Sequence, residues 1–219
     1  MTDEAHTLPA LRVGVTGHRC HRLQQMDEPL LRQRVHDVLG WLSAHEGSAA
    51  NLSLFGLDGV CGSVAVISAL AEGADQLVAE EALRMGCALQ CSLPFERDEY
   101  AADFAVPAAQ EEYRALLAKA EGVVELAGSR ETRASEEAAY ANVGYHVVAH
   151  SDLLLAIWDG EEAHGIGGTA YVVASALQYG LAVIWINAHT PHRVLVLNQP
   201  GDGRPVATAD WPGGDADLD

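Results

Sequence analysis

Short apolar runs alternate along this chain with longer stretches in which apolar residues recur at helical spacing. The runs are rich in Val, Ile and Leu and span residues 11–15, 63–70, 87–93, 152–158 and 181–187. Runs of this length, bounded by glycine, proline or polar residues, are typical of buried strands. The helical stretches cover residues 29–44, 76–85, 100–120, 135–151 and 170–178. Strands that alternate with crossover helices predict an α/β fold, with a Rossmann-like parallel sheet and helices on both faces.

The chain length fits a single domain of this class. Its 219 residues can bury a core without disulfides or a structural metal. We expect residues 1–10 to be an N-terminal extension, residues 11–198 to form the domain, and residues 199–219 to be a flexible acidic tail rich in Gly, Pro and Asp. Two further patterns predict a short strand at 123–126 and an edge strand at 193–197.

The charge balance excludes one class of partner. The chain has 13 Lys and Arg against 31 Asp and Glu, so its formal net charge is 13 − 31 = −18. Nucleic-acid polymers and anionic membranes need clustered cations, which makes binding to either unexpected. Lys119 is the single lysine, so a site for a small anion must rely on arginine or on backbone N–H groups.

Neither the cysteines nor the ends of the chain point to secretion, a metal or a membrane. Cys20, Cys61, Cys87 and Cys91 have no disulfide-framework spacing and are predicted to be structural thiols in a reducing compartment. His18 and His21 bracket Cys20, but no second ligand pair stands at zinc spacing, so we expect no metal. The start of the chain lacks a signal peptide, and no apolar stretch reaches the length of a membrane span. These features predict a cytoplasmic protein.

The fold class predicts where a ligand binds. In open parallel sheets the ligand crevice lies at the carboxyl ends of the strands, where the connections diverge to opposite faces. The segments that directly follow the predicted strands are 16–19, 71–75, 94–95, 158–160 and the loop that leads to Thr169.

A glycine-rich loop, Gly165-Ile166-Gly167-Gly168-Thr169, opens the last predicted helix. Glycines allow close backbone approach and positive φ, and Thr169 can cap the helix. Free N–H groups at a helix start can hold a phosphate. The spacing matches neither the P-loop nor the dinucleotide fingerprint, and a simple tight turn remains the alternative.

Thr16, Gly17, His18 and Arg19 directly follow the first predicted strand. They combine a small residue, a permissive turn, an imidazole and a guanidinium at one strand end. Arginine is the best side chain for a bidentate contact with phosphate or carboxylate. The alternative for Arg19 is a solvated loop residue.

Acidic residues follow two other predicted strands. Glu72, Gly73 and Asp75 come after the second strand, where Glu72 can accept hydrogen bonds from a ribose diol and Asp75 is equally well a helix N-cap. Asp159 and Gly160 place an acid and a turn glycine after the apolar run 152–158. Aromatic side chains near these segments are expected to be core residues more often than stacking platforms; they are Phe95, Tyr140, Tyr145 and Trp158.

Three motifs in this order resemble the SLOG superfamily of Rossmann-like proteins. They are Arg-Val-Gly-Val-Thr-Gly-His-Arg at 12–19, Ala-Leu-Ala-Glu-Gly-Ala-Asp at 69–75, and Asp159-Gly160 followed by Gly167-Gly168-Thr169. This group includes Smf/DprA, the Lonely Guy phosphoribohydrolases and nucleotide-sensing domains of bacterial defence systems. The resemblance covers roughly residues 11–187.

The resemblance implies a nucleotide or nucleotide-derived ligand, such as AMP, ADP-ribose or a cyclic nucleotide, with its phosphate on the Gly-Gly-Thr loop and no further cofactor. Matched residue by residue, it implies ligand-binding roles for Gly17, His18, Arg19, Glu72, Gly73, Asp75, Gly167, Gly168 and Thr169. Their places directly after predicted strands add Thr16, Pro94, Asp159 and Gly160 to the candidate ligand-binding residues.

Two functions follow from the resemblance. The first is a nucleotide sensor that works as a homo-oligomer or with an effector protein. The second is a phosphoribohydrolase or deoxyribosyltransferase-like enzyme that cleaves a nucleoside monophosphate. The enzymatic branch carries a catalytic Glu after the Gly-Thr pair, whereas Ala170 to Val173 contain no carboxylate here. Glu72 is the candidate catalytic residue in place of that glutamate, and Asp159 is the alternative. The missing carboxylate favours the sensor over the enzyme.

Overall fold

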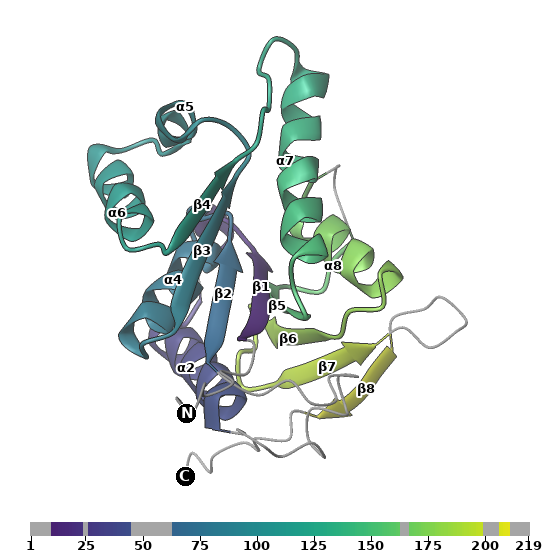
Figure 1. Ribbon diagram of the computed structural model, residues 1–219. Coiled ribbons are helices and arrows are strands. Elements are labelled where there is room, and N and C mark those ends of the chain that lie inside the picture. The colour runs from purple at the N-terminus through teal and green to yellow at the C-terminus, as the bar shows by residue number, and fades with distance from the viewer. Residues whose placement is uncertain (1–9, 24–25, 45–62, 163–166, 199–205, 211–219) are drawn as a thin grey trace, which may run out of the picture.

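The protein has one α/β domain built on a single eight-stranded sheet (Figure 1). The computed structural model describes residues 10–23, 26–44, 63–162, 167–198 and 206–210. The strands are β1 (Leu11–Gly17), β2 (Val64–Ser68), β3 (Ala88–Leu93), β4 (Gly122–Glu125), β5 (Leu153–Trp158), β6 (Val183–Asn187), β7 (Val194–Asn198) and β8 (Val206–Asp210). The strands predicted from the five apolar runs, and the two further strands predicted at 123–126 and 193–197, are confirmed within a few residues.

The sheet order makes the fold doubly wound. The strands lie side by side as β4-β3-β2-β1-β5-β6-β7-β8, and β1 to β6 are parallel. The chain moves outward from β1 to β4 and then returns to the other side of β1 to add β5 and β6. The connections therefore reverse between β1 and β5, which is the topological switch point where Rossmann-like folds bind ligands.

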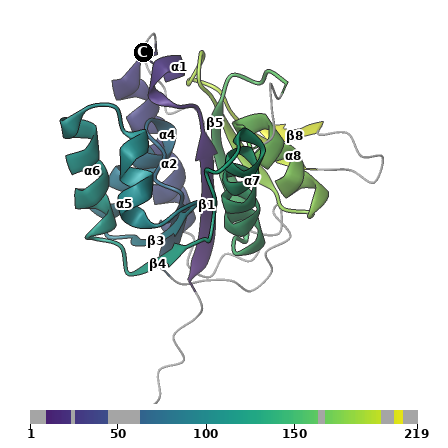
Figure 2. The ribbon, with the colours of Figure 1, turned by 90° about the horizontal axis from the view of Figure 1, so that it is seen from above.

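Helices cover both faces of the sheet, as predicted (Figure 2). One face carries α2 (Glu28–Ala44), α4 (Ala74–Arg84) and α6 (Pro107–Leu117), whose apolar side chains pack in one large core. The other face carries α7 (Arg133–Ala149), which packs on β1 and β3, and α8 (Thr169–Gln178), which packs on β5 and β6. Buried side chains from both helices belong to a second, smaller core. Val147 and Val172 are buried there, so the chain's own sheet covers these apolar helix faces.

The stretch 100–120, predicted as one helix, is divided into three. It contains the end of α5 (Arg97–Tyr100), the 3-10 turn η2 (Ala101–Asp103) and α6. Pro107 is the cause, because the residue before a proline is pushed into extended backbone, and Val106 has φ −119° and ψ 147°. A further short helix, α1 (Cys20–Leu23), follows β1 and was not predicted.

The C-terminal part of the sheet also differs from expectation. β7 pairs antiparallel with both β6 and β8, so residues 194–198 are not an edge strand. β8 lies within the segment 199–219 that was expected to be a flexible tail. The alternation Val-Ala-Thr-Ala in β8 carries the strand signal, but Gly, Pro and Asp on both sides obscure it.

The thiols within the described residues behave as structural groups. Cys87 and Cys91 are buried and free, and burial raises the pKa of Cys91 to about 12. Cys20 is free and half-buried, and Cys61 lies outside the described residues. A thiol with a raised pKa carries little reactive thiolate at neutral pH.

Candidate functional site

A pocket of about 410 Å³ lies at the switch point between β1 and β5. The end of β1, the loop before α4, the start of α8 and one side of α7 form its walls. Eight of the residues predicted from the sequence line it: Thr16, Gly17, His18, Arg19, Asp75, Gly167, Gly168 and Thr169. The fold therefore brings the first loop and the glycine loop together, although about 150 residues separate them in the sequence.

The loop after β1 is fixed by backbone contacts on both sides. The N–H of His18 donates to the carbonyl of Ile157 at 2.9 Å, and the N–H of Ala74 donates to the carbonyl of His18 at 3.0 Å. Gly17 makes this approach possible, because a Cβ at that position would lie 2.3 Å from the Cβ of Ala74. The loop is therefore held between β5 and the start of α4.

The loop after β2 contains two residues with unusual backbone conformations. Leu70 is buried with φ +54°, a rare conformation for a residue with a bulky side chain. Its N–H donates to the Ser68 hydroxyl at 3.0 Å, and its carbonyl accepts from Nε2 of Gln76 at 3.2 Å. Gly73 has φ +110°. Local strain of this kind persists only where surrounding contacts hold it, and here it turns α4 so that Asp75 reaches the pocket.

Asp75 is a buried carboxyl in the wall of this pocket. Its residue is 5% exposed. Burial raises the pKa of Asp75 to about 7, although backbone hydrogen bonds from the 69–71 segment and the charge of Arg19 act in the opposite direction. A carboxyl with this pKa exchanges its proton near neutral pH.

The raised pKa of Asp75 predicts a pH-dependent stability. The folded state holds this proton up to about pH 7, whereas the unfolded state releases it near pH 4. Stability therefore falls as the pH rises through this window, by about 3 kcal/mol between pH 5 and pH 8. Urea unfolding at several pH values measures it, with Asp75→Asn as the reference. The assignment is wrong if the stability difference between the two proteins does not change with pH.

His18 and Asp159 form a buried pair beside the pocket. Nε2 of His18 lies 2.8 Å from Oδ2 of Asp159, and their side chains are 5% and 7% exposed. Burial opposes the charge on both groups. Burial alone would raise the pKa of Asp159, but the N–H of Glu161 and the neighbouring His18 and Arg22 outweigh it, so this pKa is lowered. For His18 burial is the largest effect and lowers the pKa, although Asp159 acts in the opposite direction. Asp159 thus orients His18 and Arg22 and does not itself line the pocket.

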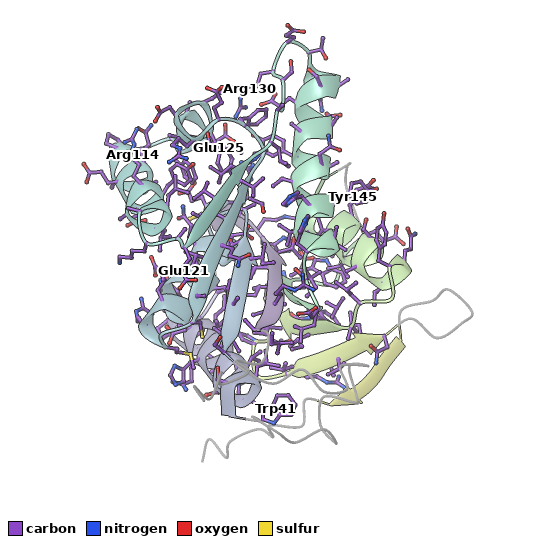
Figure 3. All side chains as sticks on the ribbon, in the orientation of Figure 1. Trp41, Arg114, Glu121, Glu125, Arg130 and Tyr145 are labelled. Atoms are coloured by element: carbon purple, nitrogen blue, oxygen red, sulfur yellow. The ribbon has the colours of Figure 1, made fainter. Side chains whose placement is uncertain are left out.

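The guanidinium of Arg19 lies in the pocket beside an aromatic ring. Its Cζ atom is 5.4 Å from the centre of the Tyr140 ring, a separation at which cation–π attraction is favourable. The neighbouring carboxylate Asp103 accepts from Tyr140 Oη at 2.5 Å and pairs with Arg130 Nη2 at 2.6 Å. Figure 3 places Arg130 at the connection between β4 and α7, beyond the strand ends. These contacts leave the charge of Arg19 facing the pocket without a paired carboxylate in the described residues.

The described part of the glycine loop leads directly into α8. Gly167 has φ +82°, and a Cβ there would lie 2.9 Å from the backbone nitrogen of Ala141 in α7. The N-cap of α8 is Gly168 and its first residue is Thr169, so Thr169 is not the capping residue that the sequence predicted. The first N–H groups of α8, which have no acceptor within an α-helix, therefore lie at the pocket. Gly165 and Ile166 lie outside the described residues.

The remaining predicted site residues lie elsewhere. Glu72 and Gly73 line a separate cavity of about 280 Å³ bordered by α1, α2 and α4. Pro94 lines another, of about 430 Å³, beside α7. Gly160 packs against the ring of Trp185, where a Cβ would lie 2.9 Å from Cζ2. The structure thus separates Glu72 from Asp75, which are three positions apart in sequence.

Several pocket residues were not predicted. Arg22 lines the pocket and lies 3.5 Å from Asp159. Tyr100 and Gly144 contribute from α5 and α7, and Glu161 and Glu162 from the segment after β5. Gly144 inside a helix was the one visible sign of a close approach, because its missing side chain makes room for Val172. The others carry no local sequence pattern.

No group of three or more His, Cys, Asp or Glu side chains in the described part of the chain is arranged to hold a metal ion. No helix within it is long and apolar enough to cross a membrane.

Comparison with known proteins adds little beyond these observations. No family model and no curated protein matches the chain. A solved structure of the structural genomics target TM1055 is 16% identical with a TM-score of 0.48, over 82% of this chain and 76% of that one. The structure of DNA processing protein A (DprA) from Streptococcus pneumoniae is 14% identical with a TM-score of 0.49, over 80% of this chain and 50% of that one. The Rossmann-like α/β class of this chain rests on its own strand order and parallel register.

Proposed function

We propose that this chain binds a nucleotide or a nucleotide-derived ligand in the switch-point pocket and acts as a ligand sensor of the SLOG type. The observation that carries the proposal is the convergence of two anion-binding features on one pocket. Arg19 lies on one wall and the start of α8 on another. A phosphate between them gains charge-assisted hydrogen bonds from the guanidinium and from the helix N-terminus.

The size and charge of the pocket support such a ligand. A volume of about 410 Å³ lies in the usual range for small-molecule sites. The net charge of −18 repels anions at a distance, so local neutralisation must be strong. Arg22, which also lines the pocket, adds a second cation to the Arg19 side. AMP, ADP-ribose and cyclic nucleotides are the candidate ligands, and no other cofactor is proposed.

Thermal unfolding with a nucleotide panel tests this proposal. We expect at least one of AMP, ATP, ADP-ribose and a cyclic dinucleotide to raise the melting temperature by about 5 to 10 °C near 100 times its Kd. Inorganic phosphate at the same concentration is the control for non-specific anion binding. Unchanged melting with every nucleotide contradicts the proposal.

Cleavage of the base from a nucleoside monophosphate is the second candidate function, and Asp75 is the observation in its favour. A pocket carboxyl with a pKa of about 7 can donate a proton to a leaving group. Glu72 lines a different cavity. If AMP yields free adenine, we therefore expect Asp75→Asn to stop the reaction and Glu72→Gln to leave it unchanged. Chromatography of the incubated nucleotide measures this, and intact AMP after long incubation rules the candidate out for that substrate.

The proposed sensor also needs a way to report its ligand. A homo-oligomer or an effector protein could provide it, and both stay predictions. The apolar faces of α7 and α8 are already covered by the sheet, so they do not require a partner. The exposed aromatic side chains nearby are Tyr145 and Tyr179, which are 37% and 67% exposed. Light scattering with and without the bound nucleotide tests whether the ligand changes the oligomeric state.

A further inference from the structure

Asp75 is the buried carboxyl of the pocket that the proposed phosphate site does not use. It is 5% exposed and yet lines the pocket. None of the ion pairs in the described part of the chain involves it. A buried carboxyl without an ion-pair partner is costly unless a hydrogen-bonding partner compensates it.

The groups that face Asp75 come from each element around it. Backbone N–H groups of the 69–71 segment and the Ser68 hydroxyl lie on the β2 side, and Arg19 lies on the β1 side. Tyr100 contributes from α5, and burial keeps its pKa well above the ordinary value, so it stays neutral. Behind it, Tyr140 and Asp103 are tied to Arg130. Asp103, the other carboxylate in this set, is paired with Arg130, and Glu161 and Glu162 line the pocket from the segment after β5.

The ligand atoms that suit the ionised form of Asp75 are hydrogen-bond donors, because a carboxylate can only accept. Phosphate oxygens are anionic acceptors and are repelled by a carboxylate, whereas hydroxyl groups donate to it. A carboxylate has two oxygens and can accept from two adjacent hydroxyls at once. In a nucleotide the vicinal 2′- and 3′-hydroxyls of ribose are the donors that lie close to the phosphate. This places the sugar against Asp75 when the phosphate occupies the Arg19 side.

We propose that Asp75 is the specificity-determining residue for ribose: its carboxylate accepts hydrogen bonds from the 2′,3′-diol, and the carboxyl proton is released to the buffer as the ligand binds. This inference rests on the proposed nucleotide binding. It assigns to Asp75 the sugar contact that the sequence predicted for Glu72.

Because the pKa of Asp75 is raised, the proposed contact predicts that protons are released when the ligand binds. In the free protein the carboxyl is about half protonated at pH 7. Hydroxyl donors favour the ionised form, so binding lowers the pKa and releases about half a proton at pH 7. Affinity is then full above pH 8 and about tenfold weaker at pH 6, because the proton must leave before the diol binds. Burial lowers the pKa of His18, the other titratable group on the β1 side, and Asp75→Asn leaves that group in place, so its contribution cancels when the two proteins are compared.

Calorimetry of ligand binding in buffers of different ionisation enthalpy tests the proposal. The probe is whichever of AMP, ATP and ADP-ribose raises the melting temperature most, paired with its 2′-deoxy analogue. The wild-type protein is expected to release about half a proton at pH 7 and to prefer the ribonucleotide by at least about tenfold. Asp75→Asn is expected to bind both nucleotides alike and to release half a proton less. Protons released by the phosphate group of the ligand contribute equally in wild type and in Asp75→Asn, so they cancel when the proton release of the two proteins is subtracted.

The outcomes separate this inference from the proposed function. Binding with equal proton release by wild type and Asp75→Asn overturns the role of Asp75 and leaves nucleotide binding standing. Absence of binding by wild type to every probe overturns both. If Asp75→Asn does not fold, the wild-type protein still decides the matter. Equal affinity for the ribo- and 2′-deoxynucleotide, or an affinity that does not fall between pH 8 and pH 6, contradicts the proposal.

Discussion

Gly73→Ala is expected to lower the free energy of unfolding by about 3 kcal/mol or more and to abolish nucleotide binding. Gly73 has φ +110°, and an added Cβ would lie 2.6 Å from the backbone nitrogen of Cys20 and 2.6 Å from the carbonyl oxygen of His18. Backbone atoms cannot move aside as the end of a flexible side chain can. The two loops at the pocket would have to separate, and Arg19 would lose its position.

Gly86→Ala is the matched control for this prediction. Gly86 also has a positive φ, +78°, but an added Cβ there meets no atom within 4 Å. It shares the conformational cost, about 1 kcal/mol, without the steric conflict. Urea unfolding of the three proteins measures the difference. An equal loss of stability in the two variants would show that the contact between the two loops is not tight.

Gly168→Asp and Arg19→Ala are expected to remove most nucleotide affinity while the protein stays folded. Loss of a charge-assisted contact at Arg19 weakens binding about 10- to 100-fold. An aspartate at position 168 stands where the phosphate is proposed to bind, and like charges in contact cost several kcal/mol, so we expect at least a 100-fold loss. The same aspartate is a good N-cap for α8, because Gly168 already has the backbone conformation of an N-cap. The free variant should therefore melt no lower than wild type.

Two variants serve as controls for this pair. Gly168→Ala adds a small uncharged side chain at an ordinary φ of −75° and should keep most of the affinity. Arg114→Ala removes an arginine from α6 (Figure 3) that does not line the pocket, and this variant is expected to bind like wild type. If Arg114→Ala weakens binding as much as Arg19→Ala does, the effect is one of net charge and the local site is not supported.

The sequence predicts the sheet of this protein better than its site. Buried parallel strands such as β2 and β5 are continuous apolar runs, which leave a strong local signal. The break at Pro107 and the outer strand β8 were missed because each depends on a local feature that the surrounding composition obscures. Helical spacing alone does not show where a single proline divides a stretch.

A pocket lies where the sequence predicted the candidate site, but only some of the predicted residues line it. Strand ends could be read from the sequence, and the two loops that carry Arg19 and Gly168 do meet at one pocket. Which carboxyl enters that pocket could not be predicted, because Glu72 and Asp75 lie on either side of Gly73. The backbone turn at Gly73 sends Glu72 to another cavity and Asp75 to the pocket. Such a choice depends on a single backbone conformation, and no residue pattern encodes it.

Native mass spectrometry with the nucleotide panel tests the central claim most directly. The account predicts that the wild-type chain binds one molecule of at least one nucleotide. At a nucleotide concentration near the wild-type Kd, this complex is strongly reduced in both Arg19→Ala and Gly168→Asp but kept in Gly168→Ala. A nucleotide complex that persists undiminished in both of the first two variants would contradict the claim that the phosphate lies between Arg19 and the start of α8.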